Sequence, residues 1–320
     1  MKFRTEVDVA PFTAKTGYGS NILAVGSCFA DNMSALLQRA KFRITVNPTG
    51  VIFNPASIAA TLERLESRRH VTREELHERN GIRFCYDFHG SFSAPSAEEA
   101  LDRMNAAIEQ GAEALTKADC VIITLGTAWV YELKCSGSIV ANCHKQPSSE
   151  FRRRRLSVDE TVWQLTSMMR GPLTGKHVIF TVSPVRHLGD GADENFLSKA
   201  TLKLAVAELV AAYPSADYFP AYEILNDDLR DYRFYADDLV HPSAKAIEYI
   251  GGKFFGAALS PETIEMMPRV LKIVEAAEHR PLNASSDAFR TFCRRNIEAI
   301  NALGGEVDMS SERRHFESFL

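Results

Sequence analysis

A serine near the start of the chain and an Asp-x-x-His segment far downstream are the side chains whose types suggest chemistry. Ser27 follows the apolar run 22–25 and precedes amphipathic helical spacing, which predicts a strand-to-helix turn. A serine hydroxyl is a weak nucleophile at neutral pH and needs a positioned base. His241 can act as that base, and Asp238 on the same loop can hold the imidazole in the productive tautomer. Asp237 is an alternative partner for His241.

Each of these features also has a purely structural interpretation. A serine at a helix start is most often an N-cap, although Ala30 rules out the Glu or Gln of a capping box. An Asp-x-x-His segment before Pro242 can simply hydrogen-bond a turn. Both features are predicted at strand ends of one sheet, and this combination favours the functional interpretation.

Continuous apolar runs alternate with amphipathic segments along most of the chain. This pattern predicts a parallel sheet covered by helices on both faces, and therefore an α/β fold. The predicted strands are 22–25, 42–46, 120–125, 178–182 and 217–221, and the predicted helices are 55–68, 97–117, 157–169, 193–212 and 242–255. We also expect a hairpin at 84–93 and a solvated helix approach at the arginine run 152–155.

The alternation stops after residue 260. The remainder predicts only helices, at 264–277 and 287–303, followed by a polar end. We therefore expect an α/β domain over 1–260 and a C-terminal helical extension over 261–320 that packs on the core.

Composition limits the classes of partner. The chain has 320 residues with 37 Lys and Arg against 41 Asp and Glu, a net charge of −4, which argues against a nucleic-acid-binding surface. Residues 1–20 lack the apolar region of a signal peptide, and no apolar stretch is long enough to span a membrane. The six cysteines are scattered without a C-x-x-C pair, so we expect reduced thiols and a cytoplasmic protein.

Function in open α/β sheets gathers at the carboxyl ends of the strands. That rule adds Asn47–Gly50, Gly126 with Thr127, and Ser183–His187 to the Ser27 turn. Arg186 and His187 can bind an anionic substrate group, and His187 is an alternative to His241 as the base. Both residues can instead have only a structural role, in the segment that leads into the next helix.

Cysteine and histidine spacing argues against a metal. Cys135, Cys143 and His144 lack the spacing of a zinc site, and Cys28 is expected to pack beneath the Ser27 turn. We therefore expect neither a metal nor a cofactor.

Residues Gly26–Ala30 read GSCFA, the signature that gives the GSCFA family its name. The chain resembles that family, which belongs to the SGNH/GDSL hydrolase superfamily. Asp238–Pro242 looks like the closing D-x-x-H block of the superfamily, and Gly50 resembles its second-block glycine. Thr124–Trp129 and Ser183–His187 also look like GSCFA segments, so the resemblance covers most of residues 21–255.

The resemblance implies a flavodoxin-like three-layer α/β/α sandwich with a five-stranded parallel sheet, as in SGNH hydrolases. It also implies ester chemistry, in which Ser27 attacks, His241 is the base, Asp238 orients it, and water resolves an acyl-enzyme. The amides of Ser27 and Gly50 would contribute to an oxyanion hole, where losing one donor typically costs ~3 kcal/mol.

One position departs from the superfamily pattern. The third block usually offers an asparagine two residues after its glycine, and here that residue is Ala128, which follows Gly126 and Thr127. Asn142, Asn54 or Thr127 are the alternatives for the missing donor.

Three functions are compatible with this sequence. The first is a serine esterase that cleaves an O-acyl ester on a carbohydrate or another small polar molecule. The second is an O-acyltransferase that uses the same triad, because both reactions share the acyl-enzyme. The third is a non-catalytic module that binds a glycan or a partner protein, for which Ala128 is the main support.

Overall fold

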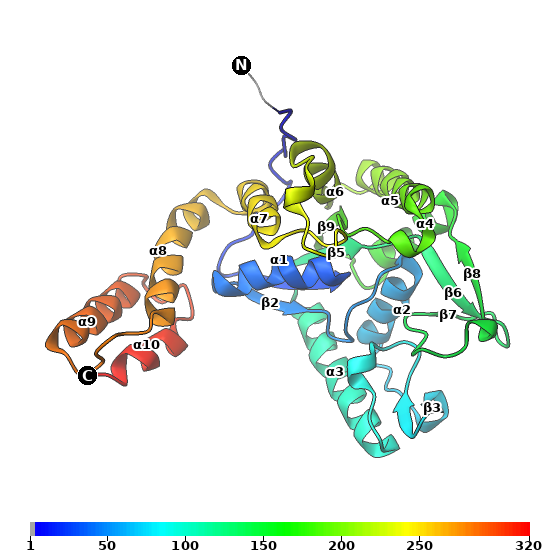
Figure 1. Cartoon of the computed structure of the whole chain (residues 1–320), viewed down its shortest axis with the longest axis horizontal. Coiled ribbons are helices and arrows are strands. Elements are labelled where there is room, and N and C mark those ends of the chain that lie inside the picture. The colour runs from blue at the N-terminus through cyan, green and yellow to red at the C-terminus, as the bar shows by residue number, and fades with distance from the viewer. Residues whose placement is uncertain (1–3) are drawn as a thin grey trace.

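A five-stranded parallel sheet forms the centre of the molecule (Figure 1). The structure, a computed structural model, describes residues 4–320. The strand order is β10–β9–β5–β1–β2, and every neighbouring pair is parallel. The strands are β1 (Asn21–Gly26), β2 (Arg43–Val46), β5 (Cys120–Leu125), β9 (His177–Val182) and β10 (Ala216–Phe219). The predicted α/β class and parallel sheet are confirmed.

Helices cover both faces of this sheet. Alternate residues of β1 divide between the faces: Ile22 and Ala24 pack with one hydrophobic cluster, and Leu23 and Val25 with another. The first cluster includes α1 (Cys28–Arg39) and α7 (Ala244–Ala258). The second includes α2 (Pro55–Glu66), α3 (Ala97–Lys117), α4 (Val158–Arg170) and α5 (Ala192–Ala212). The result is the predicted three-layer sandwich.

The register of the three inner strands brings their carboxyl ends together. Gly26 of β1 pairs with Thr124 of β5, and Leu125 of β5 pairs with Val182 of β9. The turns that follow these strands therefore lie side by side at one sheet edge.

A second, three-stranded antiparallel sheet was not predicted. It comprises β6 (Trp129–Leu133), β7 (Ile139–Val140) and β8 (Phe151–Arg155), in the order β7–β6–β8. The arginine run 152–155 is thus a strand, and our prediction of a solvated helix approach was wrong.

The arginines of β8 alternate with the period of a strand. Arg152 and Arg154 donate hydrogen bonds to Glu132 at 2.7 and 2.6 Å, whereas the guanidinium of Arg153 lies 4.3 Å from the centre of the Trp129 ring. Because these charges have partners on β6, a run of like charge can form one edge of the sheet.

The predicted hairpin at 84–93 was also wrong. The hairpin instead joins β3 (His77–Arg79) to β4 (Ile82–Phe84). The following segment ends in a 3₁₀ turn at Gly90–Phe92, where His89 Nδ1 accepts a hydrogen bond from the Ser91 amide. This local cap satisfies backbone groups that a second strand would otherwise have paired.

The start of α7 differs from the prediction as well. Ser243 is its N-cap, with Oγ accepting a hydrogen bond from the Ala246 amide at 3.3 Å. Pro242 precedes the cap and forms an isolated antiparallel bridge with Tyr235. The short helix α6 (Ala221–Glu223) follows β10.

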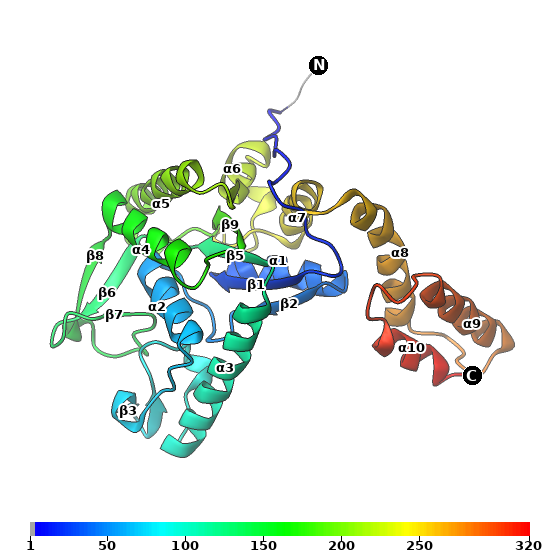
Figure 2. The ribbon, with the colours of Figure 1, turned by 180° about the vertical axis from the view of Figure 1, so that it is seen from behind.

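The C-terminal part is helical and extends from α7 to one side, opposite the small sheet (Figures 1 and 2). It consists of α8 (Pro261–Glu278), α9 (Asp287–Asn301) and α10 (Ser310–Glu317), of which α10 was not predicted. Arg39 of α1 donates to Glu278 at 3.1 Å, and Lys41 pairs with Glu312. These ion pairs, together with shared burial in the α1–α7 cluster, hold the extension against the sheet domain.

Candidate active site

The turn after β1 places Ser27 at the start of α1. Gly26 has a φ of +145°, and a Cβ there would lie 2.2 Å from the carbonyl oxygen of Thr124, so only glycine fits. Ser27 is fully buried, and its Oγ accepts a hydrogen bond from the Phe29 amide at 3.3 Å. The N-cap interpretation is therefore correct. It also leaves the hydroxyl at a helix N-terminus, where the aligned amides favour negative charge.

The turn after β2 forms hydrogen bonds with the turn after β1. Asn47 Oδ1 accepts a hydrogen bond from the buried Gly26 amide at 2.8 Å, and its Nδ2 donates to Asp31 at 2.7 Å. Asn47 has a left-handed φ of +42°, a conformation that asparagine tolerates better than most residues. Gly50 on the same turn has a φ of +87°, and a Cβ there would lie 2.2 Å from that of His89.

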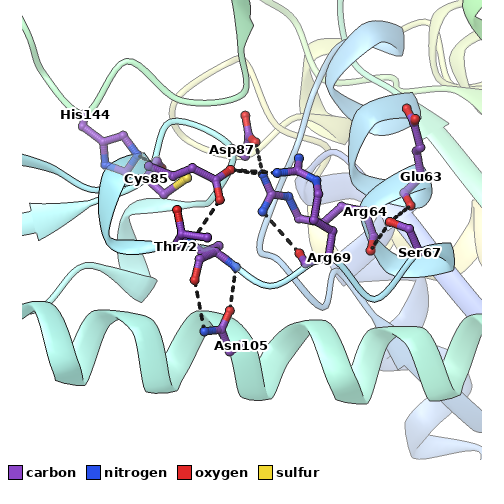
Figure 3. Close-up of polar contacts among 11 residues, drawn as sticks. Glu63, Arg64, Ser67, Arg69, Thr72, Cys85, Asp87, Asn105 and His144 are labelled. Atoms are coloured by element: carbon purple, nitrogen blue, oxygen red, sulfur yellow. Dashed lines mark hydrogen bonds and ion pairs between the residues drawn. The ribbon is translucent and has the colours of Figure 1, made fainter.

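A buried arginine, Arg64, pairs with Asp87 (Figure 3), two residues before His89. The side chain of Arg64 is only 2% exposed, and it pairs with Glu75 at 2.6 Å and with Asp87 at 2.8 Å. The His89 amide in turn donates to the Thr49 carbonyl at 3.1 Å. Arg64 therefore braces the chain that packs against the Gly50 turn.

Asp238 and His241 form a hydrogen-bonded pair. Their Oδ2 and Nδ1 atoms are 2.7 Å apart, while Oδ1 of Asp238 accepts the amides of Val240 and His241 at 2.9 Å each. The His241 amide and then its ring are the main causes that lower the pKa of Asp238 to about 2. An ionised acceptor at Nδ1 assigns the proton to that atom and leaves Nε2 free as a base. Asp238, rather than Asp237, is thus the partner of His241.

The segment after β9 holds this loop at the carboxyl edge of the sheet. The Arg186 amide donates to the Val240 carbonyl at 3.1 Å, and its Nη1 donates to the Leu239 carbonyl at 3.3 Å. The guanidinium also lies 4.4 Å from the centre of the Tyr235 ring. Arg186 therefore positions the Asp238–His241 loop, and its predicted role in anion binding stays a prediction.

His187 lies in a different environment from His241. Its amide donates to Asn195 at 2.9 Å, and its Nε2 is buried without a partner in the part of the chain that the structure describes. Burial, followed by the charge of Lys199, lowers the pKa of His187 to about 4. His187 is therefore neutral at pH 7 and a weak base, which makes His241 the better candidate.

Backbone amides at the predicted oxyanion positions already have acceptors. The Ser27 amide donates to the Thr124 carbonyl at 3.1 Å, and the Gly50 amide donates to the Asn47 carbonyl at 2.8 Å. Donation from these amides to an oxyanion requires that they share or exchange these acceptors, so that role stays a prediction.

The backbone amides of the turn after β5 also already have hydrogen-bond acceptors. The Gly126 and Thr127 amides both donate to the Phe53 carbonyl, at 2.8 and 3.1 Å, and the Ala128 amide donates to Ser198 Oγ at 2.8 Å. The missing third donor is therefore not a free amide of this turn.

A cavity of about 390 Å³ gathers several of the predicted side chains. Its lining includes Asn54, Thr127, Asn142 and His187, together with aromatic residues and the Arg153–Asp190 ion pair. Neither Ser27 nor His241 lines this cavity. Asn54 uses both ends of its amide, because Oδ1 accepts the Ser57 amide and Nδ2 donates to Ser57 Oγ. Thr127 Oγ1 accepts the Trp129 amide and lies 3.0 Å from Ser198 Oγ. Asn142 Oδ1 accepts the His144 amide, which leaves its Nδ2 as the side-chain donor of the three alternatives that can still reach a ligand.

Two residues of this region were not singled out from the sequence. Ser198 and Lys199 lie on the buried face of α5, 1% and 2% exposed, and contact the turns after β5 and β9. The only signal was a lysine on the apolar side of an amphipathic segment.

The cysteines form no metal site. All six are free thiols, and Cys28, next to Ser27, is half-buried with a pKa raised mainly by burial. Within residues 4–320, no group of three or more His, Cys, Asp or Glu side chains is placed to hold a metal ion.

Comparison with family models identifies the chain. The model described as the GSCFA family matches residues 21–254, which include the whole central sheet. This chain belongs to the GSCFA family. A second model, described as the GSCFA domain protein C-terminal domain, matches residues 270–320, the region of α8 to α10.

The solved structures similar to this GSCFA chain include one of low sequence identity. It is the crystal structure of a carbohydrate esterase family 3 from Talaromyces cellulolyticus, with 10% sequence identity and a TM-score of 0.34. The match covers 77% of this chain and 97% of that chain. No curated protein matches the GSCFA chain. Within residues 4–320, no helix has the length and apolar character that a membrane span requires.

Proposed function

We propose that this GSCFA-family chain is a serine esterase of the SGNH/GDSL type that cleaves an O-acyl ester on a carbohydrate or another small polar molecule. One observation carries the proposal: the Asp238–His241 pair, with Nε2 free, is held at the sheet edge where Ser27 begins α1. In this proposal, two parts of the chain far apart in the sequence, Ser27 and the Asp238–His241 pair, supply the three groups that activate a serine.

The reaction follows from these roles. His241 Nε2 takes the proton from Ser27 Oγ as that oxygen bonds to the ester carbonyl carbon, and Asp238 stabilises the resulting imidazolium. The tetrahedral intermediate collapses as the alcohol leaves, protonated by His241. Water, deprotonated by His241, then attacks the acyl-enzyme, and the carboxylic acid and the free serine are regenerated. Because Ser27 is fully covered, substrate access requires side chains over it to move.

The nearby cavity supports a polar substrate. Its aromatic and amide side chains suit a hydroxylated ring, and its one ion pair, Arg153 with Asp190, leaves it without excess charge. We assign the alcohol part of the ester to this cavity.

The exposure of the base favours hydrolysis over acyl transfer. The side chains of Asp238 and His241 are 50% and 44% exposed, so water can reach the position from which His241 would activate the second nucleophile. An acyltransferase using the same residues needs water to be excluded.

Replacement of Ser27 tests this function. We expect Ser27→Ala to lower the hydrolysis of p-nitrophenyl acetate and of an acetylated sugar by at least ~10³-fold, and to abolish labelling by a fluorophosphonate. Ser34→Ala is the matched control, because Ser34 is a buried serine on the same helix. Hydrolysis by Ser27→Ala at the wild-type rate would exclude Ser27 as the nucleophile, and acetylated acceptor sugar in the products would favour transfer.

A further inference from the structure

Lys199 is a buried cation at the carboxyl edge of the sheet. It is 2% exposed, and its Nζ donates to the Gly126 carbonyl at 2.6 Å and to the Ser183 carbonyl at 2.7 Å. No carboxylate within residues 4–320 pairs with it. Burying an unpaired ammonium group is costly, and the cost appears as a pKa lowered to about 7 by burial.

Two further residues of α5 hydrogen-bond to the turns that follow β5 and β9. Asn195 lies one turn before Lys199 on α5, Ser198 directly precedes Lys199, and both are buried. Ser198 Oγ accepts the Ala128 amide at 2.8 Å and lies 3.0 Å from Thr127 Oγ1, while Asn195 accepts the His187 amide at 2.9 Å. We call Asn195, Ser198 and Lys199 the α5 clamp.

The two carbonyls held by Lys199 belong to opposite halves of the candidate active site. Gly126 continues from β5, whose Thr124 carbonyl accepts the Ser27 amide. Ser183 opens the segment in which Arg186 bonds the loop of Asp238 and His241. One ammonium group thus ties the strand that supports the nucleophile to the segment that supports the base.

We propose that Lys199 is a positioning residue that, with the rest of the α5 clamp, sets the separation of Ser27 and His241. The proposal rests on the proposed esterase function. Its physical basis is that a triad tolerates little displacement, and that buried, fully bonded neighbours hold side chains in place better than exposed ones.

The charge of Lys199 also affects the electrostatics at the start of α1. It lies close enough to Cys28, the residue after Ser27, for its charge to lower the pKa of that thiol against the larger effect of burial. At pH values below its pKa of about 7, Lys199 is mostly protonated, and a positive charge near Cys28 then favours the oxyanion that develops when Ser27 attacks.

The test compares Lys199→Met with Lys203→Met in the full chain. Lys203 lies one helical turn further along α5, with its side chain 43% exposed and paired with Glu223. We expect Lys199→Met to reduce kcat for p-nitrophenyl acetate and the rate of fluorophosphonate labelling by about 10- to 100-fold, with KM and the thermal midpoint of the folded protein little changed. Lys203→Met should stay close to wild type in all four measurements. Wild-type kcat and labelling in Lys199→Met would overturn the proposal.

Further measurements separate this proposal from the proposed function. If wild type neither hydrolyses esters nor reacts with the probe, the esterase function fails. Crystal structures then test Lys199 alone, because the Gly126 and Ser183 turns should move apart in Lys199→Met and an unchanged spacing would refute the role. If Lys199→Met does not fold, Ser198→Ala replaces it: a lower kcat at unchanged KM supports the clamp, and wild-type kcat refutes it.

Discussion

The side chain of Asn47 stabilises the turn that carries Ser27, and the substitution Asn47→Ala measures how much free energy of unfolding it contributes. The substitution leaves the Gly26 amide buried without its acceptor, at a cost of ~1–3 kcal/mol. It also forces alanine to a φ of +42°, which adds ~1 kcal/mol. We therefore expect the free energy of unfolding to fall by about 2–4 kcal/mol, measured by urea denaturation. Because the freed turn carries Ser27, fluorophosphonate labelling should slow as well.

Asn80→Ala is the matched control for the cost of placing alanine at a left-handed φ. Asn80 has a φ of +51° in the exposed β3–β4 turn, so its substitution removes a left-handed asparagine without breaking a buried hydrogen bond. It should cost only ~1 kcal/mol and leave labelling unchanged. If Asn47→Ala costs no more than Asn80→Ala, the Gly26 bond does not stabilise the turn, and the reasoning fails.

Two further substitutions test other contacts of the site. The pKa of Asp238 is lowered to about 2 in the folded protein, so its contribution to stability is present above its ordinary pKa and is lost as pH falls towards 2. Asp238→Asn should therefore flatten the loss of stability between pH 4 and 2, followed by denaturation midpoints, and equal slopes in the two proteins would contradict the assignment. Arg64→Met leaves Glu75 and Asp87 without their shared cation. Amide exchange should then quicken in residues 70–90, and unchanged protection there would show that Arg64 does not brace the segment.

The three inner strands of the central sheet were predictable because they are buried on both faces. All six residues of β5 are buried, and burial on both sides leaves a continuous apolar run that the sequence displays directly. β8 gave no such signal, because it is half-exposed and its arginines are stabilised by Glu132 and Trp129 on another strand. A charge run is ambiguous until the partners of its charges are known.

Some contacts of the candidate site join residues that are close in the sequence, and these could be predicted. Others join residues that are far apart, and these could not. Asp238 and His241 lie close in the sequence, so their hydrogen bond can be expected from spacing alone. Lys199, in contrast, binds main-chain carbonyls of Gly126 and Ser183, and a carbonyl is the same whatever residue carries it. Spacing therefore finds the side chains that do chemistry, whereas a lysine that acts through the backbone becomes visible only once the strands are placed.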